Sequence, residues 1–209
     1  MSSPRELKRL IEKVNFNLIP EWNIDQINDA FKLIRDFKYL HCSNIEGNLR
    51  KIPWLFVENG CFVRASLASE LIKENLKLET KKVFIFGKFK FKSNWAKEKI
   101  VTFRDHVAIA ARVKSEVYIF DPAIKYDSAI LLKDWVNILT MDSDDMNYKL
   151  CICNLLTFSH NSNCFEVNKE NFVGIRNNIS FTLDYFTMEY LAKEYLNIID
   201  LGLDPHSIL

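Results

Sequence analysis

Cys61, His106 and Asp121 carry three side chains that together can activate a sulfur nucleophile. A thiolate attacks a carbonyl carbon, an imidazole beside it moves the proton, and a carboxylate fixes the tautomer of that imidazole. These residue types therefore support acyl transfer through a thioester. The chemistry requires the fold to bring together residues that are far apart in the chain.

Cys61 is predicted to open a helix. Gly60 ends the apolar segment before it, and apolar residues then recur on one helical face at Cys61, Ala65, Ala68 and Ile72. The unpaired N–H groups and the positive dipole end of a helix N-terminus favour a thiolate and can hold an oxyanion. The alternative is that Cys61 is a small buried hydrophobic residue, the commoner place for a cysteine.

A predicted β-hairpin brings His106 and Asp121 together. Its arms are the segments 101–113 and 116–122, which are rich in β-branched and aromatic residues, with a two-residue turn at 114–115. His106 then lies diagonally from Asp121 on the same face, at about 7–8 Å between backbones, within reach of a His–Asp hydrogen bond. A slip of one residue would separate the two side chains, so the hypothesis depends on the register. The pairs that the turn sets are Val113 with Glu116, Ala111 with Tyr118, Ile109 with Phe120, and Ala108 with Asp121.

Each member of this pair also has an ordinary structural interpretation. A lone His106 is typical of a surface or hydrogen-bonded strand histidine, and Asp121-Pro122 is typical of a turn that ends a strand. The convergence of the two with a cysteine at a helix start is what favours a catalytic interpretation.

The segments around these residues resemble the protein-glutaminase family of protein-glutamine deamidases. The similarity covers about 52–135, and its most specific part is Gly-Cys-aromatic-x-Arg-Ala. It implies a papain- and transglutaminase-like fold with Cys61 as nucleophile, His106 as general base and acid, and Asp121 as the residue that orients the histidine. Ser66 departs from the family, which often has histidine there, and this bears on substrate preference more than on the triad. The motifs that carry the resemblance are Ile52-Pro53-Trp54-Leu55-Phe56, Asn59-Gly60-Cys61-Phe62-Val63-Arg64-Ala65, Asp105-His106-Val107-Ala108 and Tyr118-Ile119-Phe120-Asp121-Pro122.

The predicted fold class is α+β, with the nucleophile at the N-terminus of a helix packed on an antiparallel sheet that carries His106 and Asp121. We expect a single domain over 1–209, with a helical N-terminal part at 1–50, a catalytic core at 52–135, and a C-terminal strand and helices at 136–209. The elements expected outside the hairpin are helices over 4–14, 24–39 (with a capping box at Asn23 and Gln26), 128–139 and 183–201 (closed by Gly202 and Pro205), and strands over 82–92 and 148–156.

The strand over 82–92 ends in a strict Lys/Phe alternation. Such a strand has a charged face and an apolar face. An exposed basic ladder could contact a protein substrate, but a solvated face over a packed one is the simpler interpretation.

Composition excludes several function classes. The 209 residues include 28 Lys+Arg and 27 Asp+Glu, a formal net charge of +1, and 48% are hydrophobic. A near-neutral chain without a basic tract does not indicate nucleic-acid binding, and this much hydrophobic content indicates an ordered globular protein. No apolar run is long enough to span a bilayer, and the first residues lack the apolar core of a signal peptide, so we expect a protein made in a cytosol.

Five cysteines make an odd number for a disulfide framework and indicate a reducing compartment. Cys151, Cys153, His160 and Cys164 could nominally bind zinc. However, Cys-x-Cys on an apolar run is typical of a strand, and structural zinc sites more often have a gap of two to four residues between paired ligands. We expect no metal or organic cofactor.

The function implied by the resemblance is hydrolysis of glutamine side-chain amides in a protein substrate through a Cys61 thioester. A transglutaminase or a cysteine protease would use the same triad, and a non-catalytic binding module could keep the fold. The resemblance, the absent signal peptide and the cysteine usage together suggest a bacterial protein delivered into a host cell by a specialised secretion system.

Overall fold

The structure is a computed structural model that describes residues 15–41, 48–50, 52–142, 148–155 and 172–205. Within these ranges the side chains of 39–41, 48–50 and 172–184 are not described. The expected helix over 4–14 therefore lies outside the described residues. None of the helices in the described part of the chain is long and apolar enough to cross a membrane.

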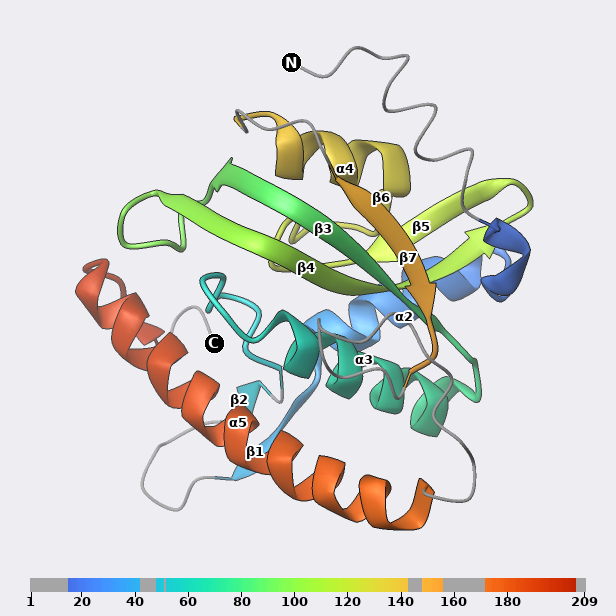
Figure 1. Cartoon of the computed structure of the whole chain (residues 1–209). Helices are drawn as coiled ribbons and strands as arrows, with labels where there is room; N and C mark the ends of the chain where they lie inside the picture. Colours follow the sequence, from blue (N-terminus) through green and yellow to red (C-terminus); the bar gives the residue numbers. More distant parts are fainter. Residues whose placement is uncertain (1–14, 42–47, 51, 143–147, 156–171, 206–209) are drawn as a thin grey trace.

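The core of the fold is a five-stranded antiparallel sheet with helices on both sides (Figure 1). Its strand order is β6-β5-β4-β3-β7, and every neighbouring pair of strands in it is antiparallel. In Figure 1, α4 lies above the sheet and α2 and α3 lie below it. The strands of this sheet are β3 (Lys81–Lys92), β4 (Ile100–Val113), β5 (Glu116–Phe120), β6 (Ile130–Leu131) and β7 (Lys149–Cys153). The other elements are η1 (Phe16–Leu18), α2 (Ile24–Asp36), β1 (Lys38–His41), β2 (Asn48–Arg50), α3 (Cys61–Leu76), α4 (Leu132–Thr140) and α5 (Phe172–Asp200).

The predicted α+β class is confirmed, including the helix that begins at Cys61 and packs on an antiparallel sheet. Gly60 is the N-cap of α3 with a left-handed backbone at φ +79°, a conformation that glycine adopts without strain. Apolar residues on several faces of α3 are buried, because the helix packs against β4, α2 and α5. Its apolar positions therefore lie at the centre of the core.

The predicted register of the β4–β5 hairpin is also confirmed. Val113 pairs with Glu116, Ala111 with Tyr118, and Ile109 with Phe120. A two-residue turn joins the strands, and Lys114 takes positive φ there. The strand period of two then fixes which residues beyond Phe120 share a face with His106.

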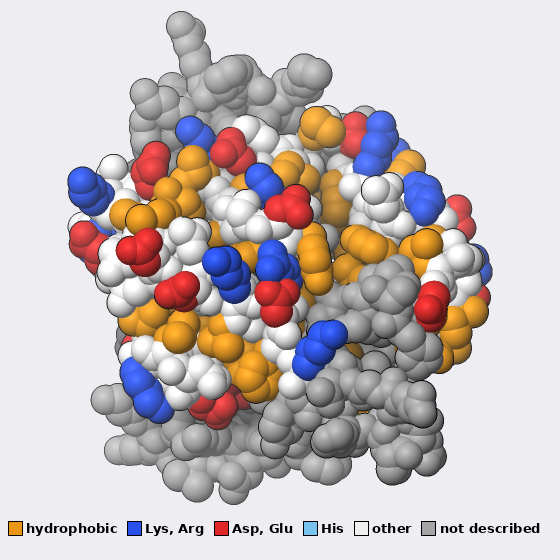
Figure 2. Space-filling view, turned by 180° about the vertical axis from the view of Figure 1, so that it is seen from behind, with side chains coloured by type: hydrophobic (Ala, Val, Ile, Leu, Met, Phe, Trp, Pro, Cys, Tyr) orange, Lys and Arg blue, Asp and Glu red, His pale blue; other side chains and the backbone are white. Residues whose placement is uncertain are grey.

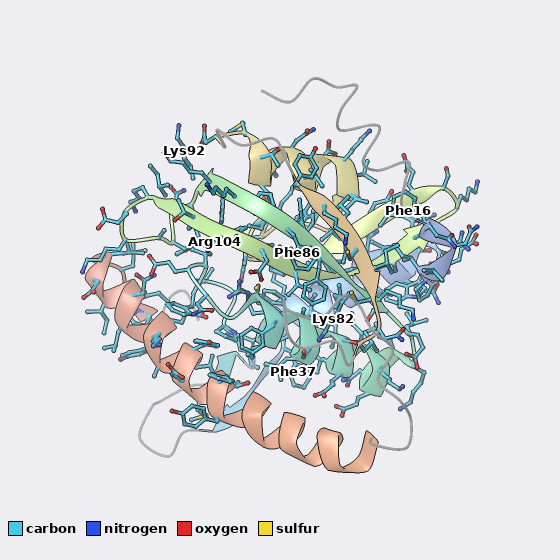
Figure 3. All side chains as sticks on the ribbon, in the orientation of Figure 1. Phe16, Phe37, Lys82, Phe86, Lys92 and Arg104 are labelled. Atoms are coloured by element: carbon cyan, nitrogen blue, oxygen red, sulfur yellow. The ribbon has the colours of Figure 1, made fainter. Side chains whose placement is uncertain are left out.

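β3 shows the two faces that its Lys/Phe alternation predicts. Phe89 and Phe91 are buried, whereas the lysines between and beside them are exposed. The β3–β4 register shifts between Phe86 and Phe89, so a bulge interrupts the ladder halfway along. Figure 3 shows Lys92 toward the far end of this hairpin and Lys82 beside α3.

Two helix boundaries differ from the sequence prediction. The helix expected over 24–39 ends at Asp36, because Phe37 has an extended backbone and Lys38 begins β1, which pairs with β2. The N-terminal part is therefore not wholly helical. The helix expected over 128–139 begins at Leu132, since Ile130 and Leu131 pair with β5 as β6. In both places the apolar spacing continues across a change of element.

α5 begins at Phe172 rather than at 183 and ends at Asp200, where Gly202 has φ +74°. Its first turns contain Gly174, Asn177 and Asn178. Because these residues have weak helix propensity, the sequence does not indicate that the helix begins before 183. Its end was predicted correctly, because a glycine after the last turn is a strong stop signal. In Figure 1, α5 runs along the lower side of the molecule beside α3.

The surface mixes charges of both signs. On the face seen in Figure 2, Lys and Arg side chains are interspersed with Asp and Glu, and hydrophobic side chains lie between them. This distribution agrees with the near-neutral net charge of +1. It contains no broad basic surface of the kind that binds nucleic acid, on the part of the face that the structure describes.

Candidate active site

Cys61 is the first residue of α3, where the backbone N–H groups point out of the helix end. The first intrahelical bond of the helix is donated by the N–H of Arg64 to the carbonyl of Gly60. No side chain caps this end. The N–H groups of the first three residues, from Cys61 onward, therefore have no partner within the helix. Such donors, at the positive end of the helix dipole, favour an anion at Cys61.

His106 and Asp121 form a buried pair across the β4–β5 hairpin. Nε2 of His106 lies 2.7 Å from Oδ2 of Asp121, and each residue is 3% exposed. Because a carboxylate only accepts hydrogen bonds, Nε2 carries the proton and donates. Asp121 thus fixes both the tautomer and the orientation of the ring, as the predicted hairpin register requires.

The Cys61 thiol and the His106 ring lie within side-chain hydrogen-bonding reach, and this contact acts on the pKa of both groups. Since Asp121 occupies Nε2, the nitrogen left to face the sulfur is Nδ1. The structure therefore brings all three sequence-predicted residues into one line of hydrogen bonds, from the end of α3 to the end of β5.

The charges of the line favour a thiolate beside an imidazolium. Burial disfavours the thiolate, but the hydrogen bond and the charge of His106 outweigh it and lower the pKa of Cys61 below its usual range. Burial also disfavours the imidazolium, yet the charge and the hydrogen bond of Asp121 raise the pKa of His106 to about 9. His106 is therefore charged at neutral pH, and its charge favours the thiolate form of Cys61.

Trp135 is a further site residue, in the segment 128–139 where the sequence indicated only a helix. It is fully buried on α4, and its indole Nε1 donates to Oδ2 of Asp121 at 2.9 Å. Its ring also lies 5.7 Å from that of His106. No sequence signal distinguishes this tryptophan from a core residue.

Phe103 supports the other side of the imidazole. Its ring stacks on His106 with centroids 4.9 Å apart and planes at 22°. Phe89 and Phe91 of β3 pack on Phe103 in turn, each at 5.6 Å. The apolar face of the Lys/Phe alternation therefore supports the histidine.

Arg64 is a second site residue whose role the sequence did not reveal. Its guanidinium is buried, and Nη1 donates to the carbonyls of Phe56 and Asn59, both at 2.6 Å. It therefore ties the chain before Gly60 to the first turn of α3. Its positive charge also helps to lower the pKa of Cys61.

Ser66 occupies the position where the family often has histidine. Its hydroxyl donates to the carbonyl of Phe62 at 2.8 Å and accepts from Nζ of Lys82 at 2.7 Å. Lys82 is fully buried on β3, and burial lowers its pKa to about 7, although Glu70 and Cys61 act in the opposite direction. Figure 3 shows Lys82 between the sheet and α3.

The candidate zinc ligands do not form a site in the described part of the chain. No group of three or more His, Cys, Asp or Glu that could hold a metal occurs there, and His160 and Cys164 lie outside it. Cys61 and Cys151 are free, whereas Cys153 is disulfide-bonded. The disulfide removes Cys153 as a thiolate ligand, although the odd cysteine count indicated a reducing compartment.

The chain is similar to known proteins in fold and in sequence pattern. Two solved structures share the fold, each at 17% identity: the NMR structure of protein-glutaminase from Chryseobacterium proteolyticum (TM-score 0.53, covering 75% of this chain and 84% of that one) and a crystal structure of protein-glutaminase (TM-score 0.55, covering 81% and 89%). A search of curated proteins finds no match. The sequence pattern of the glutaminase family matches residues 27–139, more than half of the chain and a span that includes Cys61, His106 and Asp121. The chain therefore belongs to the glutaminase family.

Proposed function

We propose that this protein is a protein-glutamine deamidase that hydrolyses glutamine side chains to glutamate and ammonia. The observation that carries the proposal is the line of hydrogen bonds from Cys61 through His106 to Asp121, in a chain of the glutaminase family. The roles are nucleophile for Cys61, general acid and base for His106, and orienting carboxylate for Asp121.

In the first half-reaction, the Cys61 thiolate attacks the carbon of the side-chain carboxamide. The negative charge moves to the carboxamide oxygen, and the N–H groups at the start of α3, which make no bond within the helix, hold this oxyanion. His106, protonated at Nδ1, gives that proton to the amide nitrogen. The carbon–nitrogen bond breaks, ammonia leaves, and a thioester remains on Cys61.

In the second half-reaction, the neutral imidazole takes a proton from water, and the hydroxide that forms attacks the thioester carbon. Collapse of the tetrahedral intermediate breaks the carbon–sulfur bond and returns the thiolate and the imidazolium. The product is a glutamate side chain. Each turnover adds one negative charge to the target at neutral pH and increases its mass by about one dalton.

Protein-bound glutamine is the proposed substrate, rather than the free amino acid. The support is the likeness in fold to two structures described as protein-glutaminases. Target proteins are set by surface contacts outside the triad. Delivery into a host cell stays a prediction of the sequence.

The decisive experiment measures ammonia release and intact mass on a glutamine-rich protein such as a casein. Wild type is compared with Cys61→Ala and with Cys151→Ala, which removes the other cysteine known to be free. We expect steps of about one dalton and matching ammonia with wild type and Cys151→Ala, and neither with Cys61→Ala. Equal activity in wild type and Cys61→Ala would exclude Cys61 as the nucleophile.

The same samples separate the related chemistries. Cross-linked species on a gel would indicate a transglutaminase, because a lysine amine would then take the acyl group in place of water. Fragments would indicate a protease. Tight binding of the substrate by wild type without any mass change would indicate a non-catalytic module.

A further inference from the structure

α5 lies outside the residues that match the family pattern, yet one face of it touches the chain around the nucleophile. The segment from Phe56 to Phe62, here called the nucleophile turn, leads through Gly60 into α3. Any movement of this turn moves the Cys61 sulfur relative to His106.

Tyr190 of α5 contacts the nucleophile turn before, within and after its tightest point. A Cβ atom on Gly60 would lie 2.8 Å from Cδ2 of Tyr190, so the glycine backbone sits directly against the ring. The ring stacks on Phe56 at 5.5 Å and 25°, and meets Phe62 edge-on at 6.4 Å and 83°. Tyr190 is 4% exposed, as expected of a residue enclosed by these contacts.

Arg64 holds the same turn from within the protein. Its Nη1 binds the carbonyls of Phe56 and Asn59, whereas Tyr190 covers Gly60. The turn is therefore fixed by a charged hydrogen-bond donor and by an aromatic face. Gly60 satisfies two demands at once, since its φ of +79° and its contact with the ring both disfavour a side chain.

Neighbours on α5 hold the Tyr190 ring in place. Phe186 stacks on it at 5.7 Å and 11°, and also meets Phe62 edge-on at 5.6 Å. Nζ of Lys193 lies 5.6 Å above the ring. Further along the helix, Asn197 donates to the carbonyl of Trp95 at 2.6 Å, which anchors α5 to the β3–β4 loop.

We propose that Tyr190 is a positioning residue that, by packing on Gly60, fixes the Cys61 sulfur and the first N–H groups of α3 for reaction. α5 is then part of the active site, although the family pattern does not include it. The expected changes in kcat and KM rest on the proposed deamidase function, whereas the expected change in Cys61 alkylation does not. The flat ring carries the effect, because the contacts with Gly60, Phe56 and Phe62 are all made by its faces and edges.

The test uses the full chain with Tyr190→Ala, Tyr190→Leu and Tyr190→Phe. Two readouts are measured: kcat and KM for deamidation of a short peptide with one glutamine, and the pH dependence of Cys61 alkylation by iodoacetamide, followed by peptide mass. For Tyr190→Ala we expect kcat to fall by about 10- to 100-fold with a smaller change in KM, since a displaced reacting group costs this much. The midpoint pH of alkylation should rise. Tyr190→Phe should stay within about twofold of wild type, because it keeps the ring.

Two control variants separate positioning from loss of stability. Met188 is 55% exposed on the same helix, so Met188→Ala should leave both readouts unchanged. Leu191 is buried on α5, and Leu191→Ala should lower the melting temperature without the matching loss of kcat. Tyr190→Leu keeps an apolar side chain, and it replaces Tyr190→Ala in both measurements if Tyr190→Ala does not fold.

The proposal is wrong if Tyr190→Ala or Tyr190→Leu, folded by circular dichroism, keeps kcat and the alkylation midpoint of wild type. It is also wrong if Leu191→Ala, at equal loss of melting temperature, loses as much kcat. Alkylation does not require deamidation. If wild type fails to deamidate the peptide, the alkylation midpoints alone decide the role of Tyr190, and only the proposed function is lost.

Discussion

The indole Nε1 of Trp135 and the carboxylate of Asp121 are joined by a 2.9 Å hydrogen bond, which ends on the same oxygen that accepts from His106. Oδ2 of Asp121 thus receives donors from two elements, α4 and β4. Two donors restrict rotation of the carboxylate more than one donor does. The fixed carboxylate in turn holds the His106 imidazole in one orientation.

Trp135→Phe tests that restriction. It keeps a large aromatic ring but removes the indole N–H, and we expect kcat/KM to fall by about tenfold and stability by about 1–2 kcal/mol. The control is Trp54→Phe, because Trp54 donates a buried hydrogen bond to the carbonyl of Ile34, with no catalytic residue involved. Steady-state kinetics and thermal unfolding check both variants. Equal rates for the two variants at equal stability would mean that Trp135 acts only as a core residue.

Asp121→Asn should change both rate and pH dependence. Asp121 raises the pKa of His106 to about 9, so the pair stabilises the folded protein fully below the usual histidine pKa of 6.5 and loses this contribution as the pH rises through about 9. Without the carboxylate, the pKa of His106 falls and less of the imidazolium is present at neutral pH. We expect kcat/KM to drop by about 10²- to 10⁴-fold and the alkaline limb to move to lower pH. An unchanged pH profile would contradict the role of the carboxylate.

Phe103→Leu should lower the rate by loosening the histidine. Phe103 stacks on His106 at 4.9 Å and is itself packed by Phe89. We expect kcat to fall by about 3- to 10-fold, because a displaced base misplaces the proton it transfers. Lys90→Ala, on the exposed face of the same strand as Phe89, is the matched control and should stay within about twofold. If Lys90→Ala loses more activity on a protein substrate than on a peptide, the exposed lysine face of β3 contacts the target protein.

Lys82→Met should stabilise the protein at neutral pH. Burial lowers the pKa of Lys82 from 10.5 to about 7, against the opposite effects of Glu70 and Cys61, so the unfolded chain binds more protons between these values. The contribution of Lys82 to stability therefore rises with pH across that window, and the penalty is largest at about pH 7 and below. We expect a higher melting temperature for Lys82→Met at pH 7 and a smaller difference near pH 10. Lys90→Met, at an exposed position of the same strand, is the control for the replacement of lysine by methionine itself.

The hairpin register and the start of α3 could be predicted from the sequence because each depends on local signals. The two-residue turn at 114–115 and the strand period of two place His106 and Asp121 on one face, and Gly60 marks where α3 begins. The N-terminal boundaries of α4 and α5 could not be predicted. Leu131, the N-cap of α4, makes no side-chain capping bond, and the first turns of α5 contain several weak helix formers.

The roles of the residues around the triad could not be predicted from sequence patterns. Trp135 and Tyr190 fall in apolar helix patterns, and Arg64 stands in the family motif without an assigned role, because the partners of all three lie on other parts of the chain. Only tertiary contacts distinguish them. The Lys/Phe alternation correctly predicted which side chains are buried, but not that Phe89 and Phe91 support Phe103 and, through it, the histidine.

The most direct test of the thiolate–imidazolium pair is the pH dependence of Cys61 alkylation by iodoacetamide in wild type and in His106→Ala, with Cys151 as the internal reference thiol. We expect wild-type Cys61 to titrate below the usual thiol pKa of 9.0, and His106→Ala to shift that midpoint upward and slow the reaction at pH 6. A wild-type midpoint at or above 9, or one that His106→Ala leaves unchanged, would contradict the pairing of Cys61 with His106.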